Sequence, residues 1–114
     1  MKKLSFEKTW NDLVDILDDG KVIHTLSRNC PNEITAVDYN GIWVMTRKSS
    51  PKSKQVPKWM FKRAIEHLLE HRNLSNDTLL NELNVKRSSF VMAALSRLNY
   101  IGYEINPLRI FLKN

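Results

Sequence analysis

Residues 73–112 read NLSNDTLLNELNVKRSSFVMAALSRLNYIGYEINPLRIFL. We predict a first helix capped by Ser75 or Asn76, because side-chain oxygens of these types accept from the free amides of a helix's first turn. Asn84 is where this helix should stop, since asparagine tolerates left-handed backbone geometry. A second amphipathic segment and two short β-rich runs follow. The order of signals therefore predicts helix, turn, helix and β-hairpin.

We place the second helix at residues 87–98. Its apolar positions recur at spacings of three and four, which predicts a buried stripe of Val91, Ala94, Leu95 and Leu98. We expect the opposite side to be exposed and to consist of Arg87, Ser88, Ser89, Met92, Ala93, Ser96 and Arg97. Arg and Ser at the start of a helix are residue types that reach phosphates and base edges. An ordinary solvated face is an equally simple interpretation.

The two β-rich runs, 100–105 and 108–112, are separated by Asn106 and Pro107, which form a turn signal. A hairpin directly after two such helices is a wing, and residues 56–113 resemble the winged helix-turn-helix superfamily in this respect. The resemblance implies binding of double-stranded DNA, with the second helix in the major groove and the wing on the backbone. The implied contacts are Lys86, Arg87, Ser88 and Ser89 at the groove-entering end of the helix, and Arg109 and Lys113 in the wing. Arg97, on the side of the helix that we expect to be exposed, is a further candidate for DNA contact.

Positive charge is concentrated in one further segment. The net charge is +6 and the pI about 9.6, which favours nucleic acid or an acidic surface as a partner. Residues 47–63 hold seven Lys or Arg and no acid, and their first half has the composition of a flexible loop. We expect this loop to contact phosphates through Arg47, Lys48, Lys52 and Lys54. A solvated linker between the sheet and the helix is the alternative. The two interpretations are compatible, because a flexible loop can become ordered only when DNA binds.

The N-terminal half has its own pattern. Residues 5–19 predict a helix capped by Ser5, with apolar residues on one face. Residues 21–46 are rich in β-branched and aromatic residues and predict three short strands, with Asn40 and Gly41 in a hairpin turn. We expect these strands to form a small antiparallel sheet, packed on the first helix and on a helix that begins near Pro57.

Together these elements predict an α+β fold in a single domain of 114 residues. Residues 1–55 supply the N-terminal helix, the sheet and most of the basic loop. Residues 56–114 form the winged-helix part, in which the helix from Pro57 ends near Arg72 and Leu74 forms a short bridging strand.

Other classes of protein find little support in the sequence. A lone cysteine, Cys30, excludes an internal disulfide and fits a reducing compartment. No apolar run is long enough to cross a membrane, and the first ten residues do not resemble a signal peptide, so we expect a cytoplasmic protein.

Catalysis and cofactor binding are not expected either. The chain has three glycines and no phosphate-binding glycine loop. His67 and His71 have metal-ligand spacing, but the residues between them lack the general base of zinc proteases, and solvated helix residues are the simpler interpretation. We therefore predict no catalytic residue, no metal site and no cofactor.

The sequence leads to three hypotheses. The first is a non-catalytic DNA-binding protein that regulates transcription, of the kind found in phages and mobile elements. The second is the DNA-recognition module of a restriction or repair nuclease system. The third is a winged helix that binds and inhibits a host enzyme, which Met92 and Ala93 favour because they are poor base readers. A homodimer through the first helix and Trp10 is a further partner that we consider.

Overall fold

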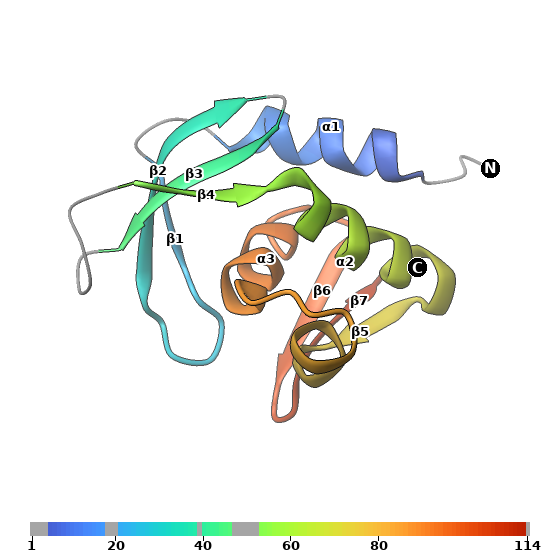
Figure 1. The fold of residues 1–114 in the computed structure, drawn as a ribbon. Coiled ribbons are helices and arrows are strands. Elements are labelled where there is room, and N and C mark those ends of the chain that lie inside the picture. Colours follow the sequence, from blue (N-terminus) through green and yellow to red (C-terminus); the bar gives the residue numbers. More distant parts are fainter. Residues whose placement is uncertain (1–4, 18–20, 39, 47–52, 114) are drawn as a thin grey trace.

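The computed structural model describes residues 5–17, 21–38, 40–46 and 53–113. Within these ranges the chain is an α+β fold with helices and two antiparallel sheets (Figure 1). A four-stranded sheet belongs to the N-terminal half, and a three-stranded sheet belongs to the C-terminal half. The predicted α+β class is confirmed.

Helix α1 spans Phe6–Ile16 and begins as predicted, because the Ser5 hydroxyl accepts from the Lys8 amide at 3.2 Å. The helix is shorter than the predicted 5–19. Leu17 already has an extended backbone and buries its side chain, so α1 stops before it.

The N-terminal sheet has four strands in the order β1-β2-β3-β4: Val22–His24, Pro31–Asp38, Gly41–Thr46 and Lys54–Pro57. We predicted only the first three and assigned the fourth to the basic loop. Strand β4 forms because Val56 is fully buried and pairs with Ile42 of β3. The chain is tight at this pairing, since a Cβ on Gly41 would lie 2.5 Å from the Val56 carbonyl oxygen.

Helix α2 spans Lys58–His71 and follows Pro57, close to the predicted start. It ends at Arg72, whose φ of 66° is left-handed, and β5 (Asn73–Ser75) follows as the predicted bridging strand. The next helix, the short π-helical η1, spans Thr78–Glu82. The predicted cap is confirmed, because the Ser75 hydroxyl accepts from the Thr78 amide at 3.1 Å.

The turn after η1 also follows the prediction, since Asn84 has a φ of 57° and Val85 is fully buried. Helix α3 then spans Ser88–Leu95, and strands β6 (Ile101–Ile105) and β7 (Leu108–Leu112) form a hairpin. Strand β7 lies between β5 and β6 in an antiparallel sheet of order β5-β7-β6.

Two predictions about α3 are wrong. The helix ends at Leu95 and not at the predicted Leu98, because the amides of Arg97 and Leu98 donate to carbonyls only three residues back, in a turn. The second prediction concerns burial. The side that we expected to be exposed carries Ser88, Met92 and Ala93, and their exposed fractions are 3%, 0% and 1%. The reason is that β1 of the N-terminal sheet packs against α3, which is covered on the side that would otherwise face solvent (Figure 1). Of the eight residues in α3, Ser89 alone is exposed.

The two halves share one hydrophobic core. Its aromatic rings run from α1 through α2 to α3: Trp10 and Phe61 are 5.4 Å apart between ring centroids, and Phe61 and Phe90 are 6.3 Å apart. Buried residues from both sheets join the same cluster. None of the helices in the described ranges is both long and apolar enough to cross a membrane.

Candidate nucleic-acid interface

The loop that joins β1 to β2 is held in a fixed shape by its own hydrogen bonds. The Thr25 amide donates to the Cys30 carbonyl, and the Cys30 amide donates to the Thr25 hydroxyl, both at 2.9 Å. The Asn29 amide donates to the Thr25 carbonyl at 2.9 Å, and Asn29 takes a left-handed φ of 57°. A loop closed in this way can present side chains without further ordering.

This loop faces the start of α3 across a cavity of about 570 Å³. Among the residues that the structure describes, three cationic residues line the cavity, and no Asp or Glu does so. We call these three residues the Arg87 cluster: Arg28 from the loop, and Lys86 and Arg87 from the start of α3. A cavity with cations and without carboxylates attracts anions, because nothing within it compensates the positive charge.

Arg87 is the most constrained member of the Arg87 cluster. Its side chain is half-buried, and burial lowers the pKa of the guanidinium below its ordinary value. Within the part of the chain that the structure describes, this guanidinium has no ion pair and no hydrogen bond. A partly desolvated cation without a partner gains stability when an anion binds beside it.

The other end of α3 has a different environment. Arg97 follows the helix and lines the same hollow as Lys8, Asp12 and Asp15 of α1. The Tyr100 hydroxyl donates to Asp12 at 2.9 Å, and Lys8 pairs with the same carboxylate at 3.2 Å. Arg97 is exposed, and the eight residues of α3, a length of roughly 12 Å, lie between it and Arg87.

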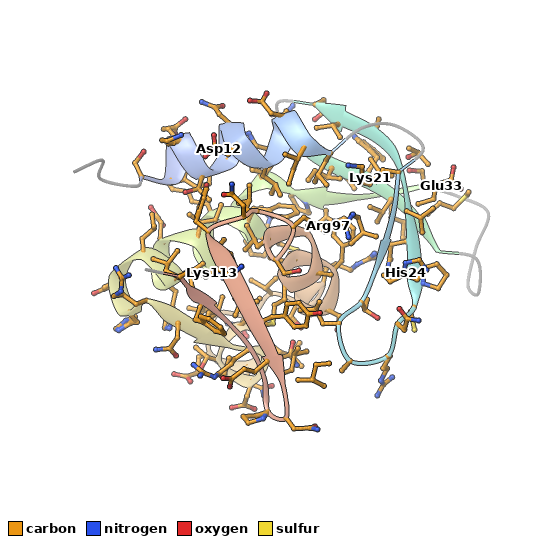
Figure 2. All side chains as sticks on the ribbon, turned by 180° about the vertical axis from the view of Figure 1, so that it is seen from behind. Asp12, Lys21, His24, Glu33, Arg97 and Lys113 are labelled. Atoms are coloured by element: carbon orange, nitrogen blue, oxygen red, sulfur yellow. The ribbon has the colours of Figure 1, made fainter. Side chains whose placement is uncertain are left out.

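The two predicted wing residues also lie in different surroundings. The Arg109 guanidinium donates to Glu104 at 2.8 Å and lies 5.3 Å from the Phe111 ring centroid. That hydrogen bond holds the pKa of the Glu104 carboxyl below its usual value. Lys113 is exposed after the end of β7, where its amide donates to the Tyr100 carbonyl. Arg109 is therefore already neutralised in part, whereas Lys113 lies near the Arg97 end of α3 (Figure 2).

The predicted basic loop is described only at its end. Lys54 is exposed at the start of β4. Arg47, Lys48 and Lys52 lie outside the described residues, so their contact with phosphates stays a prediction.

The direction in which two loops project also bears on the binding surface. The β1–β2 loop and the tip of the β6–β7 hairpin both project from the lower side of the molecule (Figure 1), and the view from behind gives the same arrangement (Figure 2). The Arg87 cluster therefore lies on the β1–β2 loop and the adjoining start of α3, on the side to which the hairpin also extends.

The two histidines of α2 lie side by side on the helix. The rings of His67 and His71 are 4.3 Å apart between centroids, and His71 lies 3.7 Å from Glu70. Burial, followed by repulsion from His71, lowers the pKa of His67. In the described ranges, no group of three or more His, Cys, Asp or Glu side chains has the arrangement of a metal site.

Arg28 is the one member of the Arg87 cluster that we did not predict. Nothing in the sequence around Arg28 indicated that it would lie near the start of α3. The two segments are far apart in the sequence, and the packing of β1 on α3 brings them together. A basic residue in a turn is the only signal that Arg28 offered.

Comparison of the chain with protein-family models, curated proteins and solved structures gave no significant match.

Proposed function

We propose that this protein is a non-catalytic DNA-binding protein of the winged-helix type, which binds duplex DNA with the Arg87 cluster. The single observation that carries the proposal is the set of three cations around one cavity, whose described lining contains no acidic residue. Duplex DNA is the partner whose regular phosphate charge suits such a surface.

The order of elements supports the winged-helix part of the proposal. Helix α2, strand β5, helices η1 and α3, and the β6–β7 hairpin follow one another as in the superfamily that the sequence resembles. The hairpin packs through β7 on the bridging strand β5, so that the C-terminal half is one three-stranded sheet with helices beside it.

The burial of α3 changes the expected mode of binding. A helix that enters the major groove must offer an exposed face to the bases, and Met92 and Ala93 are buried here. Contact is therefore proposed at the helix start, through Lys86, Arg87 and Ser89, together with Arg28. Such contacts fall mainly on phosphates, which fix the position of a protein on the duplex but carry little sequence information.

Two variants of equal charge test the proposal. We expect Arg87→Ala to weaken duplex binding by about 1–3 kcal/mol and to lower the salt slope by about 1. Arg97→Ala removes the same charge from the other end of α3 and should leave both quantities close to those of the unmodified protein. The measurement is fluorescence anisotropy with a labelled duplex over a range of salt concentrations, with thermal unfolding as the check on folding.

The result that contradicts the proposal is binding that does not depend on salt, or no binding at low salt. Equal effects of Arg87→Ala and Arg97→Ala would retain DNA binding but reject the Arg87 cluster as its surface.

A protein partner is the second candidate, and one observation favours it. Tyr103 and Ile105 of β6 are 49% and 44% exposed, and alternate residues of a strand lie on the same face. Two large apolar side chains on an exposed hairpin are a suitable contact for another protein. Salt-independent behaviour in the DNA experiment would make this candidate the preferred one.

A further inference from the structure

The cavity beside the Arg87 cluster is larger than phosphate contact requires. Its volume of about 570 Å³ lies in the range of pockets that enclose a small molecule, roughly 300–1,000 Å³. Phosphate groups on a duplex surface need no enclosed space, because side chains reach them from outside.

The walls of the cavity combine apolar and hydrogen-bonding groups. Phe90, Pro31 and Cys30 all line the cavity and supply apolar surface. Asn32 also lines the cavity, although its exposed fraction is only 4%. Its amide nitrogen donates to the Cys30 carbonyl at 3.2 Å, and within the described part of the chain its amide oxygen accepts no hydrogen bond.

These features fit a nucleobase better than a simple anion. A base offers a flat apolar face to Pro31, which is exposed, and to the small part of Phe90 that is not buried, and it offers polar edges to the amide of Asn32. A base in a nucleic acid is also joined to a phosphate, and the cations of the Arg87 cluster line the same cavity. An inorganic anion alone would leave the apolar walls without a partner.

We propose that this cavity receives one unstacked base of bound DNA, with the adjoining phosphate against the Arg87 cluster. The inference rests on the proposed function, because it assumes that DNA binds at this surface. It adds a preference for DNA in which one base is already unpaired, since unstacking and unpairing a base within a duplex costs free energy.

Two duplexes of the same sequence test this preference, one fully paired and one with a single bulged base. We expect the bulged duplex to bind about tenfold more tightly, because the free-energy cost of unpairing is then absent. In the Cys30→Trp variant, a bulky side chain fills the cavity, and the preference for the bulged duplex should disappear; thermal unfolding checks that the variant folds. Cys30→Ala is the matched control and should keep the preference.

The single cysteine of the chain supplies a readout that needs no variant. Cys30 is partly accessible, so alkylation by a maleimide reports on the cavity. The bulged duplex should slow this alkylation about tenfold more than the paired duplex does at equal saturation. Adenosine monophosphate tests whether the cavity binds a free nucleotide, and we expect it to protect Cys30 from alkylation only weakly.

The outcomes separate the two proposals. Equal binding and equal protection by both duplexes would overturn the base-binding cavity and leave the DNA-binding function intact. Protection by adenosine monophosphate as strong as that by the bulged duplex would overturn the inference in favour of a site for free nucleotides. If neither duplex binds, the proposed function and the role of the cavity are both overturned.

Discussion

The two ends of α3 each carry an arginine, but their neighbours differ. Arg87 lies half-buried in a cavity with Arg28 and Lys86, and no acidic residue is present in its described lining. Arg97 lies exposed in a hollow with Asp12, Asp15 and Lys8, where Tyr100 and Lys8 both contact Asp12. Positive charge is therefore available for a ligand at the first end and is balanced at the second. A count of basic residues along the chain does not separate these two cases, whereas the packing of neighbouring elements does.

The two ends of α3 differ because the helix between them is buried. Truncating a buried side chain of α3 is therefore the change with the largest expected effect, measured as a loss in the free energy of unfolding. Met92 is fully buried, so Met92→Ala should lower the free energy of unfolding by about 2–5 kcal/mol. The matched control is Leu80→Ala on η1, whose side chain is 39% exposed and whose truncation should cost about 0.5 kcal/mol or less. Urea unfolding measures both. Equal, small effects would mean that the α3 side is open and that major-groove reading is feasible.

The Arg97 end can be tested through Tyr100. The loss of its hydrogen bond to Asp12 in Tyr100→Phe should cost about 1 kcal/mol at neutral pH. Burial, with the Asp12 hydrogen bond, raises the pKa of Tyr100 from 10.0 to about 12. The stabilisation that accompanies a raised pKa is fully present below pH 10 and is lost as the pH rises to about 12.

The corresponding measurement is the free energy of unfolding of both proteins across this pH range, together with an absorbance titration of tyrosinate. The advantage of the unmodified protein over Tyr100→Phe should shrink as the pH passes from 10 towards 12. If Tyr100 instead ionises at its ordinary pKa, its hydroxyl is accessible to solvent and is not held by Asp12.

The β6–β7 hairpin offers the smallest expected effect. Arg109 is paired with Glu104 and is not fully available to phosphates. Glu104→Gln removes that charge, and we expect duplex binding to strengthen and the salt slope to steepen by up to about 0.9, the contribution of one phosphate. Ion pairs at exposed positions contribute little to stability, so the unfolding midpoint should hardly move. An unchanged salt slope would place the wing outside the DNA contact.

The sequence predicted well those features that local chemistry determines. The Ser75 cap, the left-handed Asn84, the start of α2 after Pro57 and the hairpin around Asn106–Pro107 each follow from residues within a few positions of the feature. The same reasoning predicted Lys86 and Arg87 as candidates for the binding surface.

Features that depend on distant contacts were beyond this reasoning. Strand β1 precedes α3 by more than sixty residues, so no pattern within α3 revealed that β1 would cover it. One signal was nevertheless present, because Phe90, Met92 and Ala93 leave α3 with apolar residues almost all round, which is typical of a buried helix. Arg28 entered the Arg87 cluster through the same packing.

The most direct test of the contrast between the ends of α3 is amide chemical-shift mapping by NMR with a short duplex at low salt. We predict that the largest changes fall on Arg28, Asn29 and residues 86–89, while Arg97 and Tyr100 stay unchanged. Changes centred on Arg97 and Tyr100, or none at residues 86–89, would contradict the assignment of the Arg87 cluster as the binding surface.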